Sequence, residues 1–188
     1  MDILGGNTLI SLFTGILIVI LIISGVIVWI MWSAIIGAGF EPTSKKLVIK
    51  MLEMAEIDSN DTLYDLGSGD GRIVLEAAKK YNAKAVGIEA DPLRVLWSRL
   101  FLFFSGFRNS SKIVWGNFFN EDISEATAVT LFLGHNANQK LKSKLVNELK
   151  FGTPVVSYIW TFEGWEPINV DKKEKIYLYI IGKSNYMI

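Results

Sequence analysis

The residues best suited to chemistry begin with a glycine-rich run, Asp65-Leu66-Gly67-Ser68-Gly69-Asp70-Gly71-Arg72. Its D-x-G-x-G-x-G spacing differs from the G-x-G-x-x-G of dinucleotide-binding folds, and no Gly-Lys-Ser/Thr follows to make a P-loop. Glycines lack a Cβ, so the backbone can approach a bound molecule closely, and the Asp65 carboxylate could accept hydrogen bonds from a cationic amino group. The expected cofactor contacts in this run are Asp65, Gly67, Ser68, Gly69 and Gly71.

Two further positions fit the same small molecule. Glu89 lies 18 residues after the last glycine of the run, where a carboxylate can accept hydrogen bonds from two vicinal ribose hydroxyls. Gly116-Asn117-Phe118 offers an amide for an adenine edge and an aromatic ring to stack on it. We therefore expect S-adenosylmethionine rather than NAD, with Glu89, Asn117 and Phe118 as further contacts. A turn-forming role for Asn117 and a helix-capping role for Asp70 remain open alternatives.

Alternating strands and helices must position these residues. The predicted strands are 62–66, 83–89, 112–115, 128–133 and 154–160, followed by a hairpin that ends in 175–181. The predicted helices begin after Ser44, run around 73–78, extend from Asp91-Pro92 to about Ser105, and cover about 137–149. This alternation indicates βαβ units and a mostly parallel sheet, with a ligand at the carboxyl ends of the strands.

The first forty residues differ in character from the rest. No charged residue occurs between Ile3 and Phe40, and the apolar run 9–36 exceeds the roughly 20 residues that cross a bilayer. The leader lacks the basic region of a cleaved signal peptide, so we expect an uncleaved transmembrane helix. The lipid bilayer is therefore an expected partner through residues 9–36.

The charges that flank this run predict its orientation. Lys45, Lys46 and Lys50 follow it, whereas no Lys or Arg precedes it. The excess of basic residues on the C-terminal side predicts a single-pass protein of the cell membrane with its C-terminal domain in the cytoplasm. The expected organisation is an anchor and linker over 1–40, including a Gly37-Ala38-Gly39 joint, and a catalytic domain over 41–188.

Composition excludes several other classes of protein. The 19 basic and 19 acidic residues balance, which is not typical of a strongly basic nucleic-acid binder. The absence of Cys excludes a disulfide framework, a thiolate metal site and a Cys nucleophile.

Several segments together resemble one family, the class I methyltransferases, specifically the small protein-lysine methyltransferases of the FAM173 type and their archaeal relatives. These segments are the run from Asp65 to Arg72, Gly87-Ile88-Glu89, Gly116-Asn117-Phe118-Phe119, Gly152-Thr153-Pro154-Val155-Val156-Ser157 and Gly164-Trp165. The resemblance covers about residues 40–181. It implies a Rossmann-like, mostly parallel seven-stranded sheet with a C-terminal antiparallel hairpin, S-adenosylmethionine as methyl donor, and protein lysines as acceptors. Eukaryotic relatives carry a membrane segment before the domain, which implies membrane-associated protein substrates.

A lysine acceptor must lose its proton before methyl transfer, because the pKa of its ammonium group is about 10.4. Groups at the carboxyl ends of the fourth and fifth strands could lower that pKa, accept the proton or contact a cation. The candidate catalytic residues are His135, Asn138 and Trp160, and Asn138 falls where the family tends to have Asn. The Pro-Pro-aromatic run of nucleic-acid amino methyltransferases is missing at 134–137 and the domain is not basic, so we expect no nucleic-acid partner. We expect no metal either.

These observations predict a membrane-anchored protein-lysine N-methyltransferase. Two alternatives remain open: a methyltransferase for a lipid or quinone headgroup, and a non-catalytic membrane adaptor that retains the fold. Residues 95–104 pose a separate question, because they are apolar nearly all round. Such a helix is either buried on both sides, or rests on the bilayer with Arg94, Arg99 and Arg108 at its flanks.

Overall fold

The computed structural model describes residues 3–36 and 41–185, and the chain divides into two compact units, Met1–Ile36 and Gly37–Ile188. The first unit is one helix, α1 (Ile3–Ile36). Within it, the 20 residues Leu9–Val28 form a stretch that by length and composition could cross a membrane. The expected joint at 37–39 lies outside the described residues.

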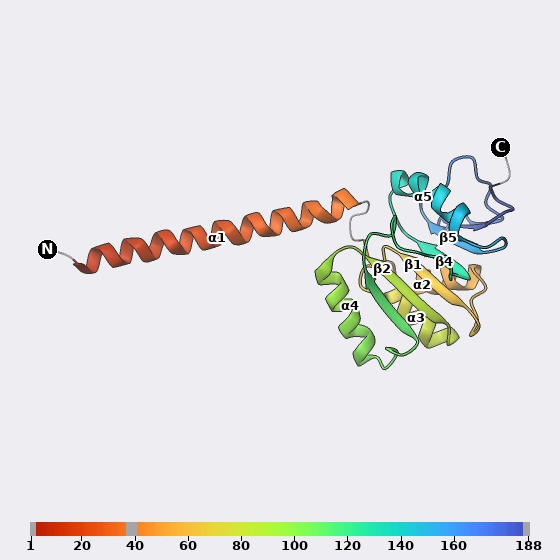
Figure 1. Ribbon diagram of the computed structural model, residues 1–188, viewed down its shortest axis with the longest axis horizontal. Helices are drawn as coiled ribbons and strands as arrows, with labels where there is room; N and C mark the ends of the chain where they lie inside the picture. Colours follow the sequence, from red (N-terminus) through yellow and green to blue (C-terminus); the bar gives the residue numbers. More distant parts are fainter. Residues whose placement is uncertain (1–2, 37–40, 186–188) are drawn as a thin grey trace. The chain divides into compact units, whose positions relative to one another are not determined.

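The second unit is built on one seven-stranded sheet in the order β3-β2-β1-β4-β5-β7-β6 (Figure 1). β1 to β5 are parallel, and β7 runs antiparallel to both β5 and β6. The strands are β1 (Thr62–Leu66), β2 (Lys84–Glu89), β3 (Ser111–Trp115), β4 (Ala128–Leu131), β5 (Pro154–Tyr158), β6 (Asn169–Asp171) and β7 (Ile176–Ile180). The expected parallel sheet with a C-terminal antiparallel hairpin is confirmed. Because β1 lies between β2 and β4, the strand order reverses there, and ligands bind at such a switch point.

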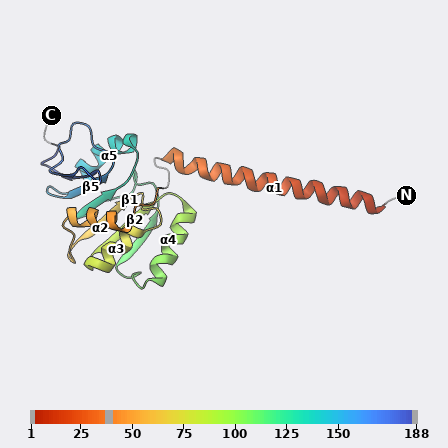
Figure 2. The same cartoon turned by 180° about the vertical axis from the view of Figure 1, so that it is seen from behind.

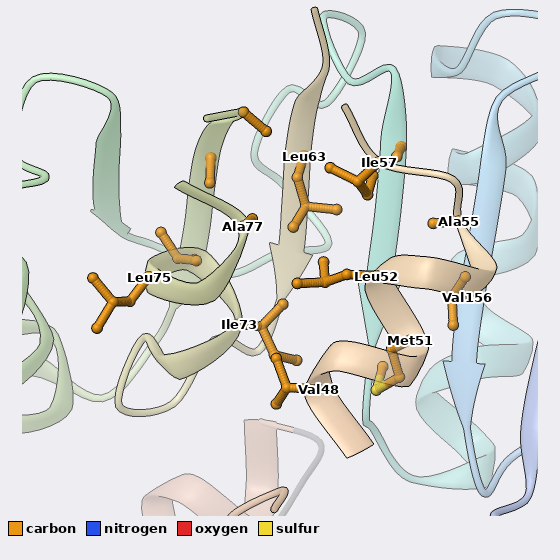
Figure 3. Close-up of a cluster of buried hydrophobic side chains, with 14 of the residues drawn as sticks. Val48, Met51, Leu52, Ala55, Ile57, Leu63, Ile73, Leu75, Ala77 and Val156 are labelled. Carbon is orange, nitrogen blue, oxygen red and sulfur yellow. The ribbon is translucent and has the colours of Figure 1, made fainter. Parts of the chain in front are cut away.

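Helices cover both faces of the sheet (Figures 1 and 2). One face carries α2 (Lys45–Met54), α3 (Arg72–Tyr81) and α4 (Pro92–Phe104), and the other carries α5 (His135–Glu148). Figure 3 shows side chains of α2 and α3 packed over Leu63 of β1, with Val48, Met51, Leu52 and Ile73 among them. This packing fixes the position of the turn between β1 and α3.

The predicted caps are confirmed, whereas three boundaries differ by two residues from the sequence prediction. Ser44 accepts a hydrogen bond from Leu47 N, and Asp91 accepts from Leu93 N at the start of α4. β4 ends two residues early, and α5 begins two residues early, at His135. β5 ends at Tyr158 because Ile159 has a φ of +68°, which is incompatible with an extended strand.

Candidate active site

The glycine-rich turn leaves β1 at the carboxyl edge of the sheet and enters α3. Its three glycines, Gly67, Gly69 and Gly71, all have a positive φ, the backbone conformation that favours glycine. The backbone N–H groups of Gly67 and Ser68 both donate to the carbonyl of Ile88, at 2.9 and 3.0 Å. The end of β2 therefore holds the first half of the turn against the sheet.

The Glu89 carboxylate holds the second half of the turn. It is buried at the end of β2, where one oxygen accepts from Gly69 N at 2.8 Å and the other from Asp91 N at 2.9 Å. A carboxylate has about four lone-pair sites, so each oxygen retains room for one more donor. This capacity suits the two vicinal hydroxyls of a ribose, and the same side chain fixes the loop that would receive it.

Asp65 brings a second carboxyl group to the base of the turn. Its side chain is buried on β1 and accepts a hydrogen bond from the Thr130 hydroxyl of β4 at 2.9 Å. Burial raises the pKa of Asp65 from 3.8 to about 7, the Thr130 hydroxyl opposes this rise, and the negative charges of Glu89 and Asp70 add to it. A cationic ligand group beside Asp65 would compensate for the buried negative charge.

The turn also contains a buried hydroxyl group and a closely packed glycine. The Ser68 hydroxyl is buried and has no hydrogen-bond partner among them. A Cβ at Gly67 would lie 2.7 Å from Leu133 Cδ2, so the backbone comes close to neighbouring atoms where only glycine fits. Together with Asp65 and Glu89, this arrangement fits the positively charged nucleoside S-adenosylmethionine.

Replacing Asp65 by Asn is expected to change how stability depends on pH. Between pH 3.8 and about 7, Asp65 keeps its proton in the folded chain but has already lost it in the unfolded chain. The free energy of unfolding of the wild type should therefore fall as pH rises through this window, by at most about 1.4 kcal/mol for each pH unit. Asp65→Asn lacks this loss, so its stability relative to the wild type should improve by roughly 3 kcal/mol from pH 5 to pH 8.

Denaturant unfolding of the ligand-free full chain in detergent, at both pH values, measures this difference. Asp58→Asn is the matched control, because Asp58 is exposed and its hydrogen bond to Asn60 N can be made by an amide. A difference between Asp65→Asn and the wild type that stays constant with pH would contradict the shifted pKa.

Asp70 and Arg72 support the turn from its outer side. The Arg72 guanidinium donates to both Asp70 oxygens, and it also donates to the Thr43 carbonyl just before α2. Asp70 Oδ1 lies 3.3 Å from Arg72 N, at the start of α3. The N-cap of α3 is Gly71, which makes no side-chain cap hydrogen bond, so Asp70 is not the capping residue and its side chain instead binds the Arg72 guanidinium.

Asn117 and Phe118, after β3, have partners within the protein. Asn117 Oδ1 accepts from Phe119 N at 3.0 Å, which is the turn-forming alternative for this residue. Phe118 is 4 % exposed in the core beside α5, and its ring packs against Phe119 with centroids 4.6 Å apart. A contact between these two residues and a cofactor stays a prediction.

The candidate catalytic residues lie close together beyond the ends of β4 and β5. Asn138 is fully buried on α5, and its Nδ2 donates to Ser157 Oγ and to the Trp160 carbonyl, each at 3.0 Å. Its Oδ1 is buried without a partner among the described residues. The Ser157 hydroxyl also donates to the Trp160 carbonyl, so two side chains hold the segment that follows the left-handed Ile159. Backbone strain of this kind is typical of functional sites.

His135 lies at the exposed edge of the same group. Its Nε2 is 3.2 Å from Glu163 Oε1, and its ring centroid is 6.0 Å from that of Trp160. Trp160 is 41 % exposed, whereas Asn138 is inaccessible. The three candidate catalytic residues are thus neighbours, but only His135 and Trp160 have surfaces that a substrate could reach.

Sequence reasoning missed three residues that support the site. Thr130 contacts Asp65, Ser157 contacts Trp160, and Gly87 lies on β2 where a Cβ would be 2.6 Å from the Ser68 side chain. The hydroxyls of Thr130 and Ser157 interrupt otherwise apolar strands, and this signal was available in the sequence. No local signal identifies Gly87 as the strand position that faces the turn.

The sheet order and the site place this protein among the class I S-adenosylmethionine-dependent methyltransferases. In the crystal structure of an RNA methyltransferase from Salinibacter ruber in complex with S-adenosyl-L-homocysteine, the matched chain is 45 % identical, with a TM-score of 0.73. The match covers 75 % of this chain and 94 % of that one. S-adenosylmethionine is therefore the cofactor, as the glycine-rich run predicted.

The particular family follows from sequence comparison. Residues 65–169 match the ANTKMT methyltransferase domain, and the chain belongs to that family. A protein-lysine N-methyltransferase of Saccharolobus islandicus (strain REY15A) is 46 % identical over 151 residues, which is 77 % of this chain and 94 % of that protein. The adenine nucleotide translocase lysine N-methyltransferase of Mus musculus is 27 % identical over 173 residues, which is 86 % of this chain and 76 % of that protein.

Proposed function

We propose that this protein is a membrane-anchored protein-lysine N-methyltransferase. Residues 1–40 act as anchor and linker, and residues 41–188 carry the catalytic domain on the cytoplasmic side of the cell membrane. The observation that carries the choice of acceptor is the 46 % identity to a protein-lysine N-methyltransferase, which spans nearly the whole of that relative. The acceptor is a lysine side chain of a membrane-associated protein.

The charge distribution favours a protein acceptor over RNA, the substrate class named for the Salinibacter ruber enzyme. Residues 41–188 carry 19 basic and 18 acidic residues, so the domain as a whole is almost neutral. Binding to a nucleic-acid backbone depends on basic residues that neutralise phosphates. Exposed Trp160 instead offers an aromatic face, which attracts a lysine ammonium group.

S-adenosylmethionine supplies the methyl group as a sulfonium, and the protein's task is to hold donor and acceptor in line. Asp65, Glu89 and the glycine-rich turn bind the donor. Trp160 borders the acceptor, and His135 is placed to accept the proton that a lysine must lose, with Glu163 beside it. Burial of the acceptor in this site would lower its pKa and favour that loss.

The membrane anchor rests on the composition of α1 and on its flanks. Leu9–Val28 is long enough for the hydrocarbon core of a bilayer, and Lys45, Lys46 and Lys50 follow the helix. Tethering of this kind raises the concentration of the enzyme near membrane proteins without any new contact.

Asn138 acts as a positioning residue, because its side chain holds the Trp160 carbonyl and is itself inaccessible. Asn138→Ala is expected to lower kcat by roughly 10- to 100-fold, the effect of a small misplacement of the acceptor site. Its affinity for S-adenosylmethionine should stay within about twofold of the wild type, since the Asn138 side chain donates to Ser157 and Trp160 rather than to the glycine-rich turn. Single-turnover kinetics and calorimetric titration of the same sample separate the two quantities. Equal losses of kcat and of affinity for S-adenosylmethionine would indicate a general packing defect instead.

The proposed function is tested by methyl transfer in native membranes. Membranes that contain the full chain are incubated with methyl-labelled S-adenosylmethionine, and proteins, lipids and RNA are separated and counted. Gly67→Arg, which fills the turn, serves as the inactive control. We expect label on lysine residues of membrane-associated proteins, located by mass spectrometry.

The other outcomes would replace this proposal. Label in the lipid extract would indicate a lipid or quinone headgroup as acceptor, and label in RNA would indicate the acceptor named for the bacterial structure. Normal binding of S-adenosylmethionine without transfer to any fraction would indicate a non-catalytic membrane adaptor.

A further inference from the structure

The outward surface of α4 is unusually apolar. The helix packs on the sheet through Val95, Ser98 and Leu102, which repeat at helical spacing. Its opposite side, here called the α4 outer surface, is accessible, and Phe104 is 81 % and Trp97 64 % exposed. The large apolar residues of this surface are Leu93, Leu96, Trp97, Leu100, Phe101, Phe103 and Phe104.

A helix on the surface of a globular domain normally presents a polar side to water. α4 contains no acidic residue and no Lys, and the first of its two arginines, Arg94, pairs with Asp91 and Glu89. The guanidinium of Arg99 donates twice to the Ile113 carbonyl of β3, at 3.0 and 2.9 Å, and is thereby held beside the helix. Figure 1 shows α4 at the outside of the domain, with one side free of other elements of this unit. The α4 outer surface is therefore an unpartnered apolar face among the described residues.

Charges around this face are strongly segregated. Residues 92–120 contain four basic residues and no Asp or Glu, whereas the rest of 41–188 contains 15 basic and 18 acidic residues. Arg108 and Lys112, just beyond α4, are exposed, and the Arg108 guanidinium lies 5.8 Å from the centroid of the Phe103 ring. An apolar face with a basic rim is the pattern of helices that lie in the interface of a bilayer with anionic lipids.

We infer that the α4 outer surface lies on the cytoplasmic leaflet of the membrane, with its apolar side chains among the acyl chains and its basic rim at anionic headgroups. This inference rests on the proposed membrane location and adds a second, lateral contact to it. A bilayer accounts for the apolar outer surface of this helix and for the charge segregation together. A second copy of the chain would not explain the basic rim, because like charges would meet across a symmetric interface.

This contact would select acceptors by their height above the membrane. α4 begins directly after Asp91, whose backbone N–H is bound by Glu89 of the donor site. The N-terminal end of the helix thus lies at the carboxyl edge of the sheet, where the methyl group is transferred. With α4 on the leaflet, the enzyme would reach lysines just outside the headgroups and would discriminate against lysines far from the membrane.

Site-specific labelling of the full chain tests the inference, because the sequence contains no Cys. Single substitutions Leu96→Cys and Phe104→Cys are labelled with an environment-sensitive fluorophore in vesicles of phosphatidylcholine, with and without phosphatidylglycerol. Phe151→Cys is the matched control, since Phe151 is a similarly exposed aromatic residue beyond the end of α5. We expect blue-shifted emission and quenching by spin-labelled lipid at 96 and 104, stronger with the anionic lipid, and water-like emission at 151.

Water-like emission at all three positions in vesicles that retain the protein on flotation would overturn the inference, while leaving the anchor intact. Shielding that rises with the protein-to-lipid ratio, together with a disulfide between copies through the thiol introduced at 104, would assign the surface to a second copy. Failure of the chain to float with vesicles would instead refute the membrane location on which the inference rests.

A kinetic readout separates the contact from the methyl transfer itself. The double variant Leu96→Glu/Phe104→Glu keeps the anchor and the donor site, and should methylate a soluble lysine peptide as the wild type does. Methylation of a lysine placed next to the bilayer in a vesicle-embedded peptide should fall roughly 10-fold, because the local geometry is lost. If the double variant methylates both substrates as fast as the wild type does, the role of α4 is contradicted. If the wild type itself transfers no methyl group, the proposed function is contradicted instead.

Discussion

Glu89→Gln is expected to weaken S-adenosylmethionine binding at least about 100-fold, as for the loss of two hydrogen bonds to a charged group. The two Glu89 oxygens accept from Gly69 N and Asp91 N and retain one site each for a ligand. An amide at this position turns one acceptor into a donor, which faces a backbone N–H and repels it. The variant should therefore lose both a ligand contact and the support of the turn, and methyl transfer should fall with the affinity.

Calorimetric titration of the full chain in detergent measures this change. Glu56→Gln is the control, because it makes the same chemical change at an exposed residue after α2. Affinity within threefold of the wild type would show that Glu89 supports the turn without contacting the donor. A large drop in melting temperature alongside the loss of affinity would indicate that the variant binds weakly because it is partly unfolded.

Gly87→Ala is expected to have the second largest effect, although Gly87 has ordinary strand geometry. A Cβ at this position would lie 2.6 Å from both Cβ and Oγ of Ser68, and 2.7 Å from Ile113 Cδ1. Ile113 Cδ1 can move, but Ser68 belongs to the turn that we propose binds the donor. Overpacking of this size costs about 1–3 kcal/mol, so we expect a lower melting temperature and an affinity for S-adenosylmethionine lower by roughly 10- to 100-fold.

A double variant identifies the clash as the cause. Ser68→Gly removes both Ser68 atoms that the new methyl group would meet and leaves only the contact with the movable Ile113 Cδ1, so Gly87→Ala/Ser68→Gly should regain most of the affinity of Ser68→Gly alone. Gly25→Ala in α1 is a control for the general effect of replacing glycine, because a Cβ there meets no atom within 4 Å and Gly25 does not have a positive φ. Additive losses in the double variant would rule out the contact between β2 and the turn as the origin of the effect.

Both variants test whether β2 positions the glycine-rich turn. Glu89 holds the turn by hydrogen bonds from β2, and Gly87 makes room for it on the same strand. The proposed donor site therefore depends on two adjacent parallel strands, and the D-x-G-x-G-x-G run is only one half of it. Asp65 and Thr130 extend the same arrangement to β4, on the other side of β1.

Local spacing in the sequence was sufficient for the order of strands and helices, for the helix caps and for the turn. Ser44 and Asp91 cap helices as predicted, because a cap depends on residues two or three positions away. The positive φ of the glycines likewise reflects a turn that adjacent residues specify. The cofactor could be predicted for the same reason, since one turn and one strand end carry most of its signature.

Only the tertiary structure decided the features that depend on distant partners. Asp65 is an ordinary carboxyl group in the sequence, and its raised pKa comes from burial among strands that meet only in the folded sheet. Phe118 is buried in the core because Ile123 and α5 pack around it, and Asn138 meets the Trp160 carbonyl because α5 crosses β5. The free side of α4 is equally a tertiary outcome, because its apolar pattern fits burial on one side or on both. Spacing along the chain fixes what neighbouring residues can do, whereas desolvation and long-range packing depend on which surfaces the whole fold covers.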